Sequence, residues 1–391
     1  MKRKICVITS TRADYGLLRC VMEKITLSSS LELQVVVTGM HLSPEFGLTY
    51  QEIEQDNFKI AYKIEALLSS DTAIGVTKSI GLSLIGFADA LNSLQPDLVI
   101  ILGDRFEIFA AATACHIAGI PIAHLHGGEV TEGAFDDALR HAITKMSSIH
   151  FVATDEYMNR VIQLGEQPKS VFLVGGLGVD SILHLKLLTR NELEQELGIK
   201  LEKNNLLITF HPTTIEKESA ESQAVELLAA LDSLQETRLV FTYPNADTGG
   251  RVIIKLINDF IRLHPNAAAY PSLGQQKYFS CVNEFDGVIG NSSSGIIEVP
   301  SFKKGTINIG SRQKGRLQAK SILNCEANRD EIKNALSLLY TDTFRENLIH
   351  TVNPYGDGGA AERIVSIIEK IPLDGINKKN FYDISSVKGR A

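Results

Sequence analysis

Strand-length apolar segments alternate with helix-length amphipathic segments along the first part of this chain. The apolar segments are Ile5–Thr9, Leu33–Thr38, Leu98–Leu102, Ile120–Leu125 and Phe151–Thr154. Amphipathic segments such as Phe106–Ala118 and Ala134–Ser147 lie between them. Continuous apolar strands separated by helices are typical of parallel βαβ units, because helices cover both faces of such a sheet. The pattern therefore predicts an α/β fold with a parallel, Rossmann-like sheet.

The same alternation begins again after Val171–Val174. The new apolar runs are Leu206–Thr209, Leu239–Thr242, Val288–Ile289 and Thr306–Ile309. The chain has 391 residues, more than the roughly 250–300 at which a single core stops growing. We therefore predict two Rossmann-like domains, residues 1–172 and 173–357. A helix at about 358–372 is expected to pack back on the first domain, and residues 373–391 form a tail.

Charge and cysteine content restrict the partners of the chain. The formal net charge is −7, which does not fit a nucleic-acid-binding surface. The sequence contains no apolar run of the roughly 18 residues that a membrane span needs. The five cysteines lie far apart and form no CxxC pair, which is typical of a protein in a reducing compartment. We expect a cytoplasmic protein with neither nucleic acid nor membrane as partner.

Polar, glycine-rich clusters follow several of the predicted strands. They include Ser10–Gly16, Gly39–Gly47, Gly103–Arg105, His124–Glu129, His211–Thr214, Tyr243–Gly250, Gly290–Gly295 and Gly310–Arg316. Ligands of open α/β sheets bind at the carboxyl ends of the strands. Two such edges that face each other across a cleft would form one shared ligand site.

Two of these clusters also have structural interpretations. Asp104 and Glu107 have the spacing of a capping box for the helix that begins there. Ser292–Gly295 is either a loop with an N-cap serine or a phosphate cradle built from amides and hydroxyls. His124 and His126 point to the same side of a strand, as in a metal site. Because no HExxH motif or nearby cysteine accompanies them, we predict no metal.

Taken together, the clusters resemble one enzyme family. Thr11–Gly16, Val37–His41, Leu102–Glu107, His126–Glu129, Arg140–Lys145, Phe210–Pro212, Asn245–Gly249, Gly290–Gly295 and Ile309–Arg316 resemble, in order, segments of the hydrolysing UDP-N-acetylglucosamine 2-epimerases of sialic-acid biosynthesis, bacterial type. The resemblance implies a two-domain fold of the GT-B kind, no cofactor and a homodimer or homotetramer. The implied substrate is UDP-N-acetylglucosamine, and the implied products are N-acetylmannosamine and UDP.

The resemblance also assigns site residues by position. Nucleotide and diphosphate contacts fall on Arg12, Ala13, Arg105, Ser292, Ser293, Glu298 and Arg312. Residues around the sugar fall on His41, Asp104, Glu129, Asp136, Arg140 and His211. The matching motifs add His126, Asn245 and Ser294 to the substrate-binding set. Animal members carry Glu where this chain has His126, so Glu129 is the substitute candidate for a base at that position.

The chemistry explains why such residues are needed. The C2–H bond of the sugar is poorly acidic, so a base removes this proton only as the C1–O bond to diphosphate breaks. Arginines stabilise the departing diphosphate. Elimination gives 2-acetamidoglucal, and hydration with inversion at C2 then needs proton-transfer groups on both faces of the ring. We assign Asp104 and Glu129 to this pair, with Asp136 as third candidate. His211 donates to the leaving phosphate or orients the acid.

Four alternatives share parts of this pattern. A sister epimerase of the legionaminic-acid type would take a GDP-linked or 4,6-modified N-acetylhexosamine. A GT-B glycosyltransferase would use the same diphosphate contacts but admit an acceptor. A non-hydrolysing epimerase would return UDP-N-acetylmannosamine, and a non-catalytic sensor would only bind the sugar nucleotide. The several carboxylates beside the predicted phosphate site favour an enzyme over a sensor.

Overall fold

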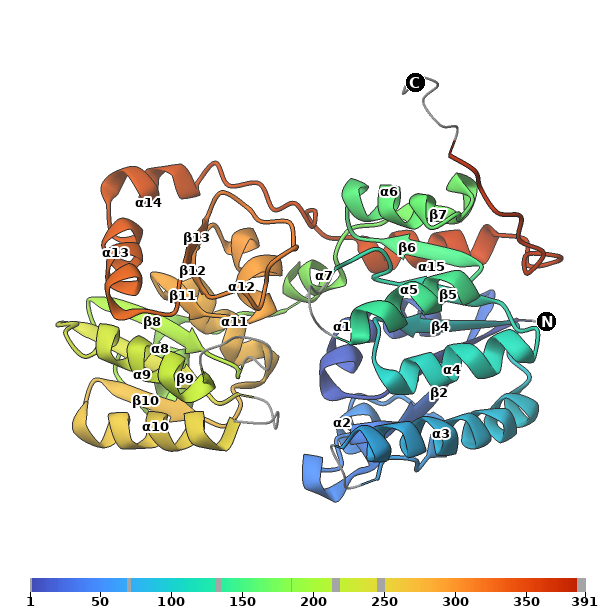
Figure 1. The fold of residues 1–391 in the computed structure, drawn as a ribbon, viewed down its shortest axis with the longest axis horizontal. Helices are drawn as coiled ribbons and strands as arrows, with labels where there is room; N and C mark the ends of the chain where they lie inside the picture. The colour runs from blue at the N-terminus through green and yellow to red at the C-terminus, as the bar shows by residue number, and fades with distance from the viewer. Residues whose placement is uncertain are drawn as a thin grey trace. The chain divides into compact units, whose positions relative to one another are not determined.

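The computed structural model describes residues 2–68, 72–130, 135–183, 185–212, 219–244 and 250–384. The chain forms two compact units, each built on one parallel sheet (Figure 1). Of the described residues, those up to 130 together with 135–181 and 358–384 form the first unit, and those from 182 to 357 form the second. The predicted α/β class with two parallel Rossmann-like sheets is confirmed.

The sheet of the first unit has the strand order β3-β2-β1-β4-β5-β6-β7. Its strands are β1 (Arg3–Thr9), β2 (Leu31–Thr38), β3 (Ile60–Ile64), β4 (Leu98–Leu102), β5 (Ile122–Leu125), β6 (Ile149–Val152) and β7 (Val171–Leu173). All neighbouring strands are parallel. The order reverses at β1, which creates the switch point where ligands of doubly wound sheets bind.

Helices cover both faces of this sheet. The helices of the first unit are α1 (Arg12–Leu27), α2 (Tyr50–Gln55), α3 (Ala73–Leu94), α4 (Phe106–Ile117), α5 (Asp136–Met146), α6 (Asp155–Gln163), most of α7 (Leu177–Leu183) and α15 (Ala360–Lys370), with short 3-10 turns at Gly39–Leu42, Pro44–Phe46 and Pro168–Ser170. Ile5 and Val7 of β1 pack toward α1 and α15, whereas Cys6 and Ile8 pack toward α3 and α4. Alternate side chains of one strand thus enter two separate cores, which explains the uninterrupted apolar run Ile5–Ile8 at the centre of β1.

The second unit repeats this plan with the strand order β10-β9-β8-β11-β12-β13. Its strands are β8 (Asn204–Thr209), β9 (Thr237–Thr242), β10 (Ala267–Tyr270), β11 (Gly287–Gly290), β12 (Gly305–Ile309) and β13 (Ile322–Cys325). Its helices are α8 (Arg190–Leu197), α9 (Ala220–Leu231), α10 (Gly250–Leu263), α11 (Gly274–Glu284), α12 (Ser293–Ile297), α13 (Arg329–Leu339) and α14 (Asp342–Leu348), with a 3-10 turn at Val299–Phe302. Leu206 and Ile208 face one core, and Leu207 faces the other.

The helix α15 returns to the first unit (Figure 1, red). The buried carboxylate of Asp180 accepts hydrogen bonds from the amides of Ala360 (2.9 Å) and Ala361 (2.5 Å), the first residues of α15. Because α7 carries Asp180, the first unit continues to Ser181 and does not end at residue 172. The structure therefore divides the chain one helix later than the sequence pattern indicated.

The tail is attached to the first unit as far as it is described. Lys379 donates to the carbonyls of Lys145 (2.8 Å) and Ser147 (2.6 Å) and lies 2.7 Å from the Glu166 carboxylate. The amide of Tyr382 donates to the carbonyl of Gly165 at 2.9 Å. Residues 373–384 thus extend the first unit as a strap.

The helix α3 differs from expectation. Within the described ranges it is the one helix that is long and apolar enough to cross a membrane, judged by length and composition alone, and about a third of its apolar stretch is buried. Phe87, Ala90 and Leu91 pack into the core, while Ile74 and Ile85 are exposed. Its buried residues, Gly75, Ser79, Ser83, Phe87, Ala90 and Leu91, lie on one side of the helix, so the same composition also fits a helix of the protein core.

Candidate active site

In the first unit, one buried arginine connects three predicted site residues. Arg140, on α5, forms a salt bridge with Asp104 and lies 3.7 Å from Oε2 of Glu129. Its guanidinium also donates to the carbonyl of His126 at 3.1 Å. Asp104 follows β4, whereas His126 and Glu129 follow β5, the neighbouring strand. The structure therefore gathers these residues at the carboxyl ends of two adjacent parallel strands.

Asp136 lies at the start of α5 and has an altered acidity. Burial, and next the charge of Asp104, raise the pKa of Asp136 from 3.8 to about 6, although Arg105 and Arg140 act in the opposite direction. A carboxyl group with this pKa exists in both protonation states near neutral pH, as acid–base catalysis requires. Asp136 and Asp104 thus form a pair of neighbouring carboxyl groups in the same site.

The capping box that the Asp104 and Glu107 spacing allows is not present at the start of α4. Arg105 is the N-cap residue, and it makes no side-chain capping bond. Glu107 instead accepts two hydrogen bonds from the Arg105 guanidinium, at 3.1 Å and 3.0 Å, and Asp104 forms a salt bridge with Arg140. A Cβ atom on Gly39 would come within 2.9 Å of Glu107, and φ of Gly39 is +57°. Glycine is therefore required where the Glu107 carboxylate passes.

His41 and His124 are buried, and the ring nitrogens of both have partners within this chain. His41 is fully buried, with its ring nitrogens 2.8 Å from Oγ1 of Thr49 and 3.0 Å from Oγ1 of Thr9. Burial lowers the pKa of His41, against the charge of Asp14. His124 lies 2.8 Å from the Gly103 carbonyl and 3.1 Å from Oγ1 of Thr144, and burial lowers its pKa to about 3. Both rings support the loops around the site, and the assignment of His41 to the residues around the sugar stays a prediction.

Arg12 and Ala13 form the exposed first turn of α1. Thr11 caps this helix together with Asp14, whose buried carboxylate accepts from the Ser10 amide at 3.0 Å and the Thr11 amide at 3.1 Å. A helix N-terminus presents amide groups and a positive dipole to an anion. The turn can thus present amides and the Arg12 guanidinium to a diphosphate. The sequence motif contained Asp14, but its supporting role could be seen only from its contacts.

In the second unit, Asn291 links the predicted phosphate loop to His211. The Asn291 side chain accepts from the His211 amide (2.7 Å) and donates to the His211 carbonyl (2.8 Å). The carbonyl of Asn291 accepts from Arg312 (3.1 Å) and from Gln313 (2.8 Å). Burial, and next the charge of Arg312, lower the pKa of His211 to about 4. His211 is therefore a neutral imidazole at neutral pH, held at the end of β8.

The serine loop follows Asn291 directly. Ser292 is the N-cap of α12, with no side-chain capping bond, and Ser293 and Ser294 begin the helix. Glu298 ends α12, where its amide donates to the Ser294 carbonyl at 2.9 Å. All four residues are partly exposed, but Oγ of Ser294 is buried. The predicted site residue Asn245 lies outside the described residues.

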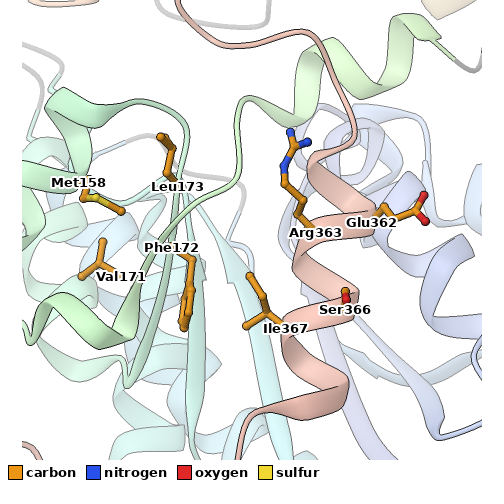
Figure 2. A pocket seen from close by; sticks show the side chains of 8 residues that line it. All are labelled: Met158, Val171, Phe172, Leu173, Glu362, Arg363, Ser366 and Ile367. Atoms are coloured by element: carbon orange, nitrogen blue, oxygen red, sulfur yellow. The ribbon is translucent and has the colours of Figure 1, made fainter.

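A pocket elsewhere in the first unit is separate from these residues. Figure 2 shows a pocket of the first unit between β7, α6 and α15, lined by Phe172, Leu173, Arg363 and their neighbours. Arg363 donates to the carbonyls of Val174 and Gly358, each at 2.6 Å. None of the predicted site residues lines this pocket. Within the described ranges, no group of three His, Cys, Asp or Glu residues could hold a metal ion.

Comparisons with known proteins place this geometry in a family. Residues 23–369 match the family model described as UDP-N-acetylglucosamine 2-epimerase. The chain is 43% identical, over 98% of its length and 100% of the relative, to a GDP/UDP-N,N'-diacetylbacillosamine 2-epimerase (hydrolyzing) of Campylobacter jejuni. It is 37% identical, over 98% of both chains, to polysialic acid biosynthesis protein P7 of Escherichia coli. A UDP-N,N'-diacetylbacillosamine 2-epimerase (hydrolyzing) of Legionella pneumophila is also 37% identical, over 98% of this chain and 100% of the relative.

Solved structures agree on the fold. The UDP-GlcNAc 2-epimerase of Neisseria meningitidis, bound to UDP-GlcNAc, superposes with a TM-score of 0.82 at 17% identity, covering 94% of this chain and 100% of that one. The Methanocaldococcus jannaschii enzyme, in complex with UDP-GlcNAc and UDP, gives a TM-score of 0.73 at 18% identity, covering 93% and 99%. The chain belongs to the UDP-N-acetylglucosamine 2-epimerase family.

Proposed function

We propose that this chain is a hydrolysing 2-epimerase, which converts a UDP-linked 2-acetamido sugar and water into UDP and the free sugar inverted at C2. The observation that carries this proposal is the cluster in which Arg140 joins Asp104, His126 and Glu129 beside Asp136. A site that only binds a neutral sugar has no need of buried charged groups such as Arg140 and Glu129, because each costs desolvation energy.

The proposed roles follow from exposure and charge. Asp104 and Asp136 are partly exposed carboxyl groups. Asp104 faces the positive charge that develops at C1 when the C1–O bond breaks, and Asp136, whose pKa is raised to about 6, is a proton-transfer group. Arg105, held by Glu107, and Arg12 neutralise the departing diphosphate. For the second unit we propose diphosphate contacts at Ser292, Ser293 and Arg312, and a neutral imidazole donor at His211.

Two sugars are candidates. The similarity to the Campylobacter jejuni enzyme, at 43% identity, favours UDP-N,N'-diacetylbacillosamine, a 4,6-modified sugar, as the substrate. The second candidate is UDP-N-acetylglucosamine, named for the Neisseria meningitidis relative that is 31% identical over 86% of this chain. The second candidate would give N-acetylmannosamine for sialic-acid biosynthesis. Competition between UDP and GDP for the free enzyme tests the nucleotide preference.

The decisive experiment is product analysis in D2O with each sugar nucleotide alone. We expect free sugar and UDP, with deuterium at C2 of the sugar. A nucleotide-linked epimer would indicate a non-hydrolysing epimerase, and a requirement for an acceptor would indicate a glycosyltransferase. Full turnover after treatment with EDTA is expected, since the proposal uses no metal. We also propose a homodimer or homotetramer, which analytical ultracentrifugation measures directly.

A further inference from the structure

The backbone of His126 has an uncommon conformation. Its φ is +63°, in the left-handed region that few residues other than glycine adopt. The His126 amide donates to the Phe151 carbonyl at 3.0 Å, and its own carbonyl accepts from Arg140 at 3.1 Å. Such a conformation costs about 1–3 kcal/mol and persists where the surrounding structure fixes it. The direction of this side chain, at the end of β5, is therefore set by contacts on both sides.

The two ring nitrogens of His126 have different surroundings. Nδ1 lies 2.8 Å from Oε1 of Glu129. Nε2 is buried, and no side chain or main-chain group in the described ranges hydrogen-bonds to it. The carboxylate favours the tautomer with its proton on Nδ1, which leaves a lone pair on Nε2. A buried nitrogen without a partner costs about 1–3 kcal/mol, so a role toward a ligand explains it better than packing.

His124, two residues earlier, shows what a structural histidine looks like in this site. Both of its ring nitrogens have partners, the Gly103 carbonyl and Thr144. His126 lacks this full set of partners, although both rings are buried. The contrast separates a supporting imidazole from one whose outer nitrogen is kept for another molecule.

Glu129 is placed to serve His126 rather than the sugar. Its side chain is 3% exposed, and its carboxylate lies beside both His126 and Arg140. Asp104, by comparison, is 19% exposed. A carboxylate that lies 2.8 Å from the imidazole Nδ1 and 3.7 Å from the guanidinium limits how far the ring can turn. Glu129 is thus a positioning residue, and the direct acid–base role that the sequence assigned to Glu129 belongs instead to His126.

Building on the proposed function, we propose that His126 is the catalytic base that removes the C2 proton, with Glu129 as its positioning partner. Nε2 takes the C2 proton, the C2–H electron pair forms the C1=C2 bond, and the C1–O pair leaves with UDP. In the hydration step, the oxygen of water bonds to C1 and the C1=C2 pair takes a proton from Asp136 at C2. The proton that water loses returns to Asp136, and the proton on Nε2 passes to solvent.

This division of labour is tested by separating the two steps. H126Q is compared with the wild type on the preferred sugar nucleotide, and on the corresponding glucal supplied together with UDP. We expect kcat for the sugar nucleotide to fall about 10²–10⁴-fold, with KM and UDP affinity within about threefold. Hydration of the supplied glucal is retained, because only elimination uses His126. H116Q, a change of an exposed histidine on α4, is the matched control and keeps wild-type turnover.

Two further variants distinguish chemistry from folding. Glycine adopts a left-handed backbone without strain, so H126G keeps the loop and opens space for a small base. Added imidazole is expected to restore turnover in H126G but not in H126Q, whose side chain fills that space. E129Q is expected to lower kcat less than H126Q does, at unchanged KM.

The outcomes separate the inference from the proposed function. If the wild-type enzyme releases UDP and free sugar from neither candidate, the proposed function fails, and the inference fails with it. If the wild-type enzyme turns over and H126Q does so equally well, the inference alone is wrong. A third outcome is that both His126 variants lose turnover, UDP affinity and glucal hydration, and that imidazole rescues neither. His126 would then have a structural role, and the inference would be wrong.

Discussion

The protonation of Asp136 gives a direct test of the site, because its surroundings disfavour the ionised carboxylate. Burial and the neighbouring Asp104 raise its pKa from 3.8 to about 6. The folded protein therefore binds this proton more tightly than the unfolded chain does. Replacing Asp136 with Asn removes the charge while keeping the shape of the side chain. We expect D136N to lose turnover and, at neutral pH, to gain stability.

The sign and size of the effect follow from linkage between protonation and folding. The cost of the carboxylate begins as pH rises above 3.8, its unfolded value, and is complete above about 6. A shift of about 2 pKa units corresponds to about 3 kcal/mol. Since the carboxyl group is partly exposed, solvent screening reduces the expected gain to about 1–2 kcal/mol. For a unit of this size the melting temperature would rise by about 2–8 °C.

The assay is thermal unfolding of D136N and the wild type at pH 7.5 and at pH 5, together with kcat at both values. The stability gain should be roughly half as large at pH 5, where much of the cost has not yet developed. Asp137→Asn is the matched control, because Asp137 lies on the same turn of α5 beside His141, 3.6 Å away. A D136N variant that melts no higher than the wild type at pH 7.5, or one that keeps wild-type kcat, would refute the reasoning.

Three further predictions concern the supports of the site and the fold. E107Q should weaken the hold on Arg105 and raise KM for the sugar nucleotide about tenfold, as steady-state kinetics would show; an unchanged KM would contradict this. Burial would raise the pKa of Glu166, but hydrogen bonds from His150 and two lysines lower it to about 2. E166Q should therefore speed amide hydrogen exchange at Tyr382 above pH 4.5. The difference in exchange rate between E166Q and the wild type should shrink as pH falls toward 2. Equal exchange at neutral pH would refute it. G290A should destabilise the second unit by about 3 kcal/mol or more, since φ is +138° and the new Cβ would lie 1.9 Å from a β8 carbonyl; an unchanged melting temperature would rule this out.

The sequence by itself determined the central strands and the place of the polar clusters. The central positions of β1 and β8, Ile5–Ile8 and Leu206–Ile208, are buried on both faces and are all apolar, so these strands are encoded locally. Three strands were not predicted: β3, β10 and β13. All three are edge strands with mixed or partial burial. An edge strand pairs on one side only and tolerates polar or small residues, so its identity depends on the neighbour that it joins.

Only the tertiary structure decided which side chains act together. Arg140 reaches Asp104 across 36 positions of sequence, so no local pattern could distinguish this pair from a helix cap at Asp104. His41 and His126 look alike in sequence, yet His41 is held at both ring nitrogens while Nε2 of His126 is buried without a partner in the described chain. Periodicity encodes which face of an element is buried, because burial repeats along the chain. The chemistry of the site depends on contacts between strands, and folding alone brings those together.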